Sequence, residues 1–252
     1  GFAAPLKSSH ILWINLITDS LPALALGVDE EENKSYMDRP PRGKDESLFA
    51  GGGLNCTCFY GALIALISMV AFLQLPVGIL LRAGNQITPA AIRTLLVDTE
   101  LLNRCQTYAF TVLGMSQLFH AIGMRDVETS LFRMNHLENR LMIAAFVIGM
   151  GLQLLVTEVP YFVVLFGTCR LTLLEWVKLL VLASMPLFAH ELLVFGSCLG
   201  EKVNRENRKE ATAGAGAKKN IHFLRGVWYN EMSVSFGQVF AGKDIGKLWK
   251  RK

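Results

Sequence analysis

Long apolar stretches without charge alternate with short polar segments along most of the chain. No Asp, Glu, Lys or Arg occurs within 47–81, 105–124 or 141–157. A helix needs about 20 mostly apolar residues to cross the hydrocarbon core of a bilayer, whereas a surface helix of a soluble bundle carries a polar stripe along one face. These three stretches therefore predict membrane-spanning helices.

Two further stretches are long enough to span a bilayer but contain charges. The stretch 8–28 holds Asp19 as its only charge, and 171–195 holds three. The apolar stretch 159–169 is too short to span, and we expect a loop there. The predicted fold is an all-α membrane protein, a bundle of five transmembrane helices at about 8–28, 54–78, 105–124, 140–157 and 171–195.

The composition agrees with a membrane protein. The chain is 52% hydrophobic and 18% charged, whereas about 25% of the residues in a soluble domain are charged. Cytoplasmic segments of membrane proteins are enriched in Lys and Arg. The segments that follow the first, third and fifth spans hold nineteen of these residues, and the segments on the other side hold five. We therefore expect the N-terminus outside and the C-terminus in the cytoplasm.

The character of the chain changes near residue 199. Residues 199–252 hold twelve Lys and Arg against five Asp and Glu, and they begin with a polar segment rich in Ala and Gly. Such a segment is typical of a flexible linker. We divide the chain into a transmembrane domain, 1–198, and a basic cytoplasmic tail, 199–252. The tail either lies on anionic lipid or has no specific partner.

A polar loop of both charge signs, 29–49, follows the first span. At its centre, a pair of prolines excludes an α-helix. The loop is longer than a connection between two helices requires, so it is either a solvated linker or a docking surface for a cytoplasmic partner. The residues of the possible docking surface are Arg39, Pro40, Pro41 and Arg42.

The first span carries three oxygen-bearing side chains on one face. At about 100° per residue, Asn15, Thr18 and Asp19 fall within a third of the helix circumference. A charge near the middle of a membrane costs about 2.5–3.5 kcal/mol on insertion scales, and it generally faces the interior of the bundle and marks a functional site. This face is therefore a candidate binding site.

Pro22 lies one turn further along the same span. It has no N–H to donate to the carbonyl of Thr18, and its ring clashes with that carbonyl. We therefore expect the helix to loosen between Thr18 and Pro22 and to free backbone oxygens, as in the broken helices where transporters bind ions.

A cluster of oxygen ligands suits a hard cation. Calcium takes 6–8 oxygens, whereas softer metals would call for Cys or His. Three side chains are too few, so further ligands must come from elsewhere. In the alternative, Asn15 and Thr18 bond to neighbouring helices, and Asp19 pairs with a distant cation.

Four segments of the sequence resemble one family of membrane proteins. WINLITDSLPALALGVD (13–29) and MDRPPRGKDESLF (37–49) are similar to the sixth membrane helix and the following loop of P-type calcium-transporting ATPases. MSQLFHAIGMR (115–125) is similar to their eighth helix, and LEWVKLLVLASMPLFAHELL (174–193) to their tenth. The resemblance covers roughly 5–196, the region from the sixth to the tenth helix.

The resemblance implies roles for particular residues. Asn15, Thr18 and Asp19 match cation-coordinating positions, and the remaining ligands come from the fourth and fifth helices, which this chain does not contain. The loop around Arg39 to Arg42 resembles the loop that contacts the phosphorylation domain. No acid lies in 105–124, so we expect at most one ion per cycle. Gln117 is either a minor ligand or a bridge between helices.

The resemblance also implies what this chain needs from outside. Such pumps use ATP and magnesium through a DKTG phosphorylation site and a nucleotide-binding domain, and neither occurs in these residues. We therefore expect no activity from the chain alone. The expected partners are the lipid bilayer and the N-terminal portion of the pump, and we expect no nucleic acid to bind. The predicted function is part of an ATP-driven cation pump, with calcium as the expected cation. The alternatives are a manganese or sodium pump fragment, or a non-catalytic membrane binding or scaffold protein.

Overall fold

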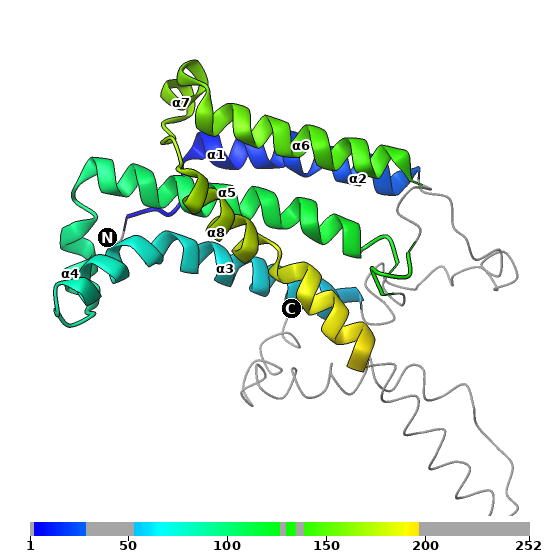
Figure 1. The fold of residues 1–252 in the computed structure, drawn as a ribbon, viewed down its shortest axis with the longest axis horizontal. Helices are drawn as coiled ribbons and strands as arrows, with labels where there is room; N and C mark the ends of the chain where they lie inside the picture. Colours follow the sequence, from blue (N-terminus) through cyan, green and yellow to red (C-terminus); the bar gives the residue numbers. More distant parts are fainter. Residues whose placement is uncertain (1–2, 29–52, 127–129, 135–138, 197–252) are drawn as a thin grey trace, which may run out of the picture. The chain divides into compact units, whose positions relative to one another are not determined.

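A computed structural model describes residues 3–28, 53–126, 130–134 and 139–196. These residues form helices and turns and contain no strand (Figure 1). In chain order the elements are α1 (Ser8–Trp13), η1 (Ile14–Thr18, a π-helical turn), α2 (Ser20–Gly27), α3 (Gly53–Arg82), α4 (Pro89–Leu95), α5 (Thr99–Gly123), α6 (Arg140–Glu158), α7 (Pro160–Phe166) and α8 (Leu173–Ala183). A turn at Ser184 separates α8 from a last helical stretch, 185–196.

The chain divides into two compact units. The first unit comprises 1–32 and 62–194, and it contains nearly all the described helices. The second comprises 33–61 and 195–252. Of the second unit, the structure describes the first two turns of α3 and the last two residues of the stretch 185–196. The tail, 199–252, and the possible docking residues Arg39, Pro40, Pro41 and Arg42 lie outside the described residues.

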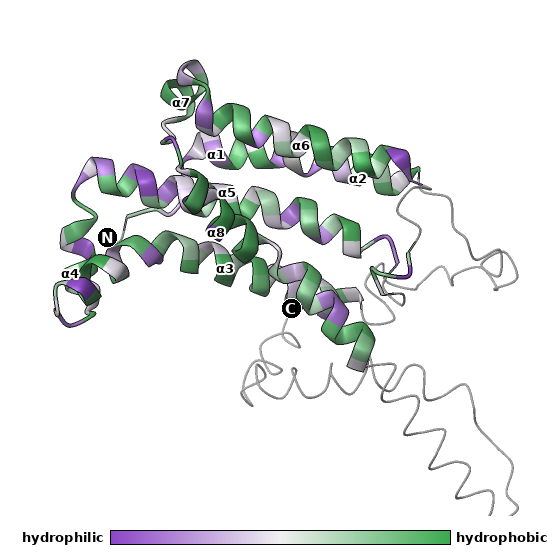
Figure 2. Cartoon of the chain, viewed as in Figure 1, coloured by the Kyte–Doolittle hydropathy of each residue, from purple (hydrophilic) through white to green (hydrophobic). Residues whose placement is uncertain are grey.

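The prediction of an all-α membrane protein is confirmed. Three helices are long and apolar enough to cross a membrane, namely Gly53–Arg82, Arg140–Glu158 and Leu173–Gly196. The predicted span 105–124 coincides with the greater part of α5, and 8–28 with the run from α1 to α2. Apolar residues cover much of these helices (Figure 2). Large apolar side chains such as Leu66, Val147 and Val181 are exposed, which suits a surface that faces lipid.

One expectation about a connection is wrong. The stretch 159–169 is not a simple loop, because it contains α7. Pro160 occupies the first turn of this helix, where its fixed φ angle suits a helix and its missing N–H removes no bond. Gly167 ends the helix with φ +63°, a left-handed conformation that glycine adopts without strain.

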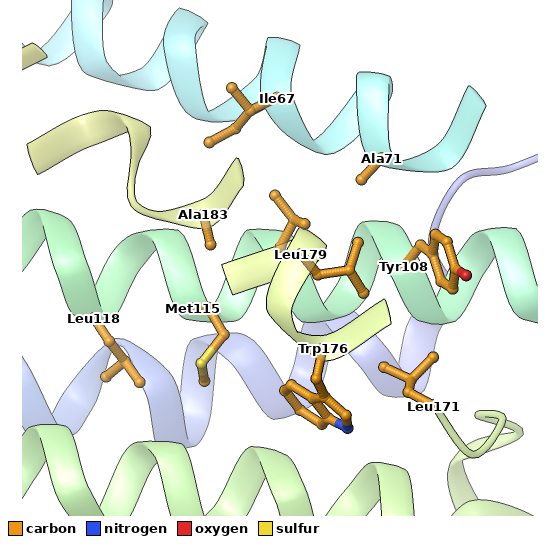
Figure 3. Packing of buried hydrophobic residues seen from close by; sticks show 10 residues of the cluster. Ile67, Ala71, Tyr108, Met115, Leu118, Leu171, Trp176, Leu179 and Ala183 are labelled. Atoms are coloured by element: carbon orange, nitrogen blue, oxygen red, sulfur yellow. The ribbon is translucent and has the colours of Figure 1, made fainter. Parts of the chain in front are cut away.

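Helix α5 lies at the centre of the first unit. It packs against α8, α6, η1 and α2, and most of its residues from Cys105 onward are buried. Figure 3 shows its side chains Tyr108, Met115 and Leu118 between the other helices. The buried cluster around them consists of Ile67, Ala71, Tyr108, Val112, Met115, Leu118, Leu171, Trp176, Leu179 and Ala183.

Helix α6 approaches α5 closely at a glycine. A Cβ atom at Gly149 would lie 2.8 Å from the methyl carbons of Leu118, whereas a Cβ at Gly151 would meet nothing within 4 Å. Small residues let membrane helices pack with their backbones near each other. Gly149 therefore sets the distance between α6 and α5. Because α2 packs along α6, this distance also determines where α2 lies.

Candidate functional site

The first helical run is broken by a widened turn. The N–H of Asp19 donates to the carbonyl of Ile14 at 3.0 Å, five residues earlier. This bond closes the π-helical turn η1, after which α2 begins at Ser20. Pro22 lies buried in the first turn of α2 and has no N–H to donate to the carbonyl of Thr18. Single π-turns within helices are frequent at functional sites.

The predicted ligand positions lie on and beside this turn. The side chains of Asn15 and Asp19 are exposed, so no other described helix covers the face that carries them. Their neighbours Leu12 and Leu16 are also exposed, at 67% and 65%. The Thr18 side chain lies outside the described part of the structure. Ile14, in the same turn, is buried in a cluster with Phe110 of α5.

The beginning of the broken run is anchored to two other parts of the first unit. The Lys7 ammonium donates to Oδ1 of Asn103 at 2.9 Å and to the carbonyl of Gly167 at 2.7 Å. The ring of His10 is buried, stacks on Phe110 with 4.5 Å between centroids, and lies 3.1 Å from the carbonyl of Phe166 through Nε2. These contacts fix α1 against α5 and the end of α7.

The second half of the run is anchored separately. Asn139 donates from Nδ2 to the carbonyl of Ala25 at 2.9 Å, and its Oδ1 accepts from the N–H of Met142 at 2.8 Å. The same side chain therefore caps α6 and holds α2. Ala25 also belongs to a small buried cluster with Ala121, Met142 and Ala145. The widened turn thus lies between two halves that are each fixed to the rest of the unit.

Gln117 on α5 is the residue that the sequence offers either as a minor ligand or as a bridge between helices. Its Oε1 atom is buried and has no hydrogen-bond partner within the described residues. Helix α5 packs against η1, so Gln117 belongs to the element beside the widened turn. A buried carbonyl oxygen without a donor is costly unless a ligand or water satisfies it.

The described residues do not form a complete metal site by themselves. They contain no group of three or more His, Cys, Asp or Glu side chains placed to hold a metal ion. Asn15 and Asp19 offer an amide and a carboxylate oxygen, which is fewer than the 6–8 oxygens of a calcium shell. The turn therefore presents some, but not all, of the oxygen ligands that a calcium ion needs, and these oxygens are exposed.

A second polar cluster was not recognised from the sequence. The Arg104 guanidinium donates to both carboxylate oxygens of Glu175, at 2.7 and 2.9 Å, and the hydroxyl of Tyr108 donates to the same carboxylate. Glu175 also accepts from the N–H and hydroxyl of Thr172 at 2.7 and 2.8 Å. The spacing of Thr172 and Glu175 is the signature of a capping box, which could have marked the start of α8.

The fold and the broken helix define a class of protein. A polytopic helical membrane protein with polar side chains beside an interrupted helix has the features of an ion-transporting membrane domain. Comparison with known sequences is specific: residues 3–195 match the family described as "Cation transporting ATPase, C-terminus". The match spans most of the chain, which therefore belongs to this family and is an integral membrane protein.

The similar proteins are calcium-transporting ATPases. The chain is 36% identical over 194 residues to calcium-transporting ATPase 1 of Bacillus cereus, with 77% of this chain and 21% of that protein covered. It is 33% identical over 198 residues to the calcium-transporting ATPase of Bacillus subtilis, with 79% and 19% covered. Calcium-transporting ATPase 1 of Yarrowia lipolytica is 27% identical over 184 residues, with 73% and 18% covered. The chain thus spans about a fifth of the length of these relatives.

Proposed function

We propose that this chain is the C-terminal membrane region of an ATP-driven calcium pump and that its broken helix supplies part of the cation site. The observation that carries the proposal is the π-turn η1, which places Asn15 and Asp19 on an exposed face between two anchored halves of one helical run. The similarity to calcium-transporting ATPases supports calcium as the cation.

The chemistry of the turn fits a hard divalent ion. Asn15 and Asp19 supply an amide oxygen and a carboxylate, and Thr18 adds a hydroxyl in the same stretch. Pro22 leaves the carbonyl of Thr18 without its usual helical donor. Oxygen ligands of mixed type and flexible geometry are what calcium prefers. The other ligands come from the N-terminal portion of the pump, which covers the exposed face of α1, η1 and α2.

Gln117 is a further, minor ligand in this proposal. Its buried Oε1 atom has no donor within the described residues, and its helix packs against η1. An amide oxygen contributes less charge than a carboxylate, so Gln117 would adjust the affinity for the cation rather than determine it. With no acid on this part of α5, we propose one ion per transport cycle.

Two further parts of the proposal concern the cytoplasmic side. The loop that contains Arg39, Pro40, Pro41 and Arg42 docks on the phosphorylation domain, and ATP and magnesium act only through the phosphorylation and nucleotide-binding domains outside these residues. The N-terminus of this chain lies outside and its C-terminus in the cytoplasm, in line with the distribution of Lys and Arg. The basic tail, 199–252, either lies against anionic lipid on that side or has no specific partner.

The test is phosphorylation of the full-length pump by ATP. Asp19→Asn keeps the size of the side chain and removes its charge, and we expect it to abolish calcium-dependent phosphorylation. Asp98→Asn is the matched control, because Asp98 caps α5 by accepting from the N–H of Glu100 and asparagine caps equally well. Unchanged calcium dependence in Asp19→Asn would reject the site. If manganese or sodium supported phosphorylation better than calcium did, that ion would replace calcium as the assigned cation.

A further inference from the structure

A cavity lies at the end of the first unit where α3 ends and α8 begins. It has a volume of about 260 Å³ and is lined by the last two turns of α3, by α5 and by the first turns of α8. It is separate from the broken helix, because none of its lining residues belongs to α1, η1 or α2. The polar residues that line it are Gln74, Arg82, Tyr108, Glu175 and Lys178.

The charges around the cavity do not cancel. The carboxylate of Glu175 is already bound by Arg104, by Tyr108 and by Thr172. Arg82 and Lys178 also line the cavity, and neither forms an ion pair or a side-chain hydrogen bond with another residue that the structure describes. Since Arg104 offsets the charge of Glu175 from outside the cavity, Arg82 and Lys178 leave an excess of two positive charges, which favours an anionic ligand.

The surroundings of the two cations are apolar. Ile79 lies one turn before Arg82 on α3 and is 41% exposed, and Leu174 and Val181 flank Lys178 on α8 with exposures of 64% and 60%. Both helices belong to stretches that are long and apolar enough to span a membrane. Long basic side chains near the ends of such helices extend toward the headgroup region. A ligand of this cavity would therefore meet positive charge at one end and lipid-facing side chains along the rest.

We propose that this cavity binds the anionic headgroup of a phospholipid. The phosphate lies between Arg82 and Lys178, and the acyl chains run along the exposed apolar faces of α3 and α8. Arg and Lys bind phosphate groups through charge-assisted hydrogen bonds, and in the proposed topology the end of α3 and the start of α8 lie at the outer leaflet. Gly78 leaves room for the headgroup, because a Cβ atom at this lining residue would meet no atom within 4 Å.

Photo-crosslinking of the full-length chain in nanodiscs tests the proposal. The probes are phosphatidylglycerol and phosphatidylcholine with identical photoreactive acyl chains, and labelled peptides are identified by mass spectrometry. We expect phosphatidylglycerol to label 74–82 and 173–181 about 25-fold more than phosphatidylcholine, since each of the two cations near a membrane surface contributes roughly a fivefold preference. Mapping the labelled peptides separates this site from the basic tail.

Four variants distinguish the effects of charge at the cavity, of its shape, and of the general surface charge. We expect Lys178→Gln and Arg82→Gln each to lower the labelling of these peptides about fivefold. Gly78→Leu keeps the charge and fills the cavity, and we expect a similar loss. The matched control is Arg93→Gln, which removes an exposed cation of α4 that does not line the cavity. Circular dichroism of each variant checks that helicity is retained, and Lys178→Gln and Gly78→Leu suffice if Arg82→Gln fails to fold.

Three results would overturn the proposal. Equal labelling by the two lipids would show that the headgroup charge is not recognised. An equal loss of labelling in Arg93→Gln would assign the effect to the general surface charge. Displacement of the lipid by inorganic phosphate at the same concentration would identify a site for a free anion rather than for a phospholipid.

Discussion

Asp19 and Glu175 are acidic side chains in apolar helical segments of this chain, and their surroundings differ. Glu175 accepts hydrogen bonds from Arg104, Tyr108 and Thr172. Asp19 is exposed, and its side chain makes no hydrogen bond or ion pair with any other residue that the structure describes. Because an uncompensated charge within a membrane is costly, we infer that Glu175 is structural, while Asp19 requires a ligand or a group from another part of the pump.

The backbone around Glu175 is regular, whereas the backbone before Asp19 is not. Glu175 lies in the first turn of α8, where it forms a capping box with Thr172. Asp19 directly follows the π-turn η1, where the helical bond pattern changes. Glu175, at a regular helix end, has its hydrogen-bond partners within the chain. Asp19, beside the irregular turn, has no such partner among the described residues. Irregular backbone in a membrane is tolerated only where protein or a polar cavity satisfies it.

The largest expected effect on stability comes from removing the charge of Glu175. We expect Glu175→Gln to lower the free energy of unfolding by about 2 kcal/mol, since hydrogen bonds to charged groups contribute about 1.5–3 kcal/mol and the Arg104 side chain is 36% exposed. Thermal unfolding of the full chain in micelles, followed by circular dichroism, measures this. Glu100→Gln is the control, because Glu100 is an exposed residue in the first turn of α5. Equal stability of the two variants would mean that the cluster around Glu175 is not structural.

A smaller effect is expected at Asn139, which connects α6 to the second half of the broken helix. Asn139→Ala removes both the cap of α6 and the donor to the carbonyl of Ala25, and we expect a loss of roughly 1–2 kcal/mol. Asn139→Asp retains the cap and replaces the donor with a carboxylate oxygen that faces the carbonyl of Ala25. In the full-length pump, the aspartate variant should weaken calcium affinity while the helix remains capped. Wild-type affinity in both variants would show that α2 needs no anchor there.

The smallest expected effect distinguishes two glycines of α6. Gly149→Ala places a methyl group against the packed side chain of Leu118, and we expect a loss of about 1 kcal/mol from overpacking. Gly151→Ala meets open space and should stabilise the helix by about 0.5–1 kcal/mol. Thermal unfolding of both variants gives the comparison. A gain of stability in both would contradict the close approach of α6 and α5.

The sequence predicted those features that depend on local pattern. Charge-free runs identified α3, α5 and α6, because a span requires only length and apolar character. The spacing of Asn15, Thr18 and Asp19 with Pro22 indicated an interruption of the first helix. The position of the widened turn, at Ile14–Thr18, depends on which backbone bonds the packed helix retains, and a proline alone does not determine it. That these three residues bind a cation stays a prediction.

Features that join distant parts of the chain could not be predicted. Lys7 reaches Gly167 and Asn103, and no local pattern reveals such a contact. The charges within 171–195 appeared to weaken that span, but Glu175 is neutralised by Arg104, which lies just outside another predicted span. The short stretch 159–169 predicts a loop rather than a span, whereas Pro160 and Gly167 at the two ends of α7 are the residues that favour the helix found there.

The most direct test of the central claim is equilibrium binding of radioactive calcium to the full-length pump that carries either Asp19→Asn or Glu175→Gln. We expect Asp19→Asn to lose calcium binding while its thermal stability is retained. We expect Glu175→Gln to bind calcium with wild-type affinity while its stability is reduced. Wild-type calcium binding by Asp19→Asn would contradict the assignment of the exposed acid at the broken helix as a cation ligand.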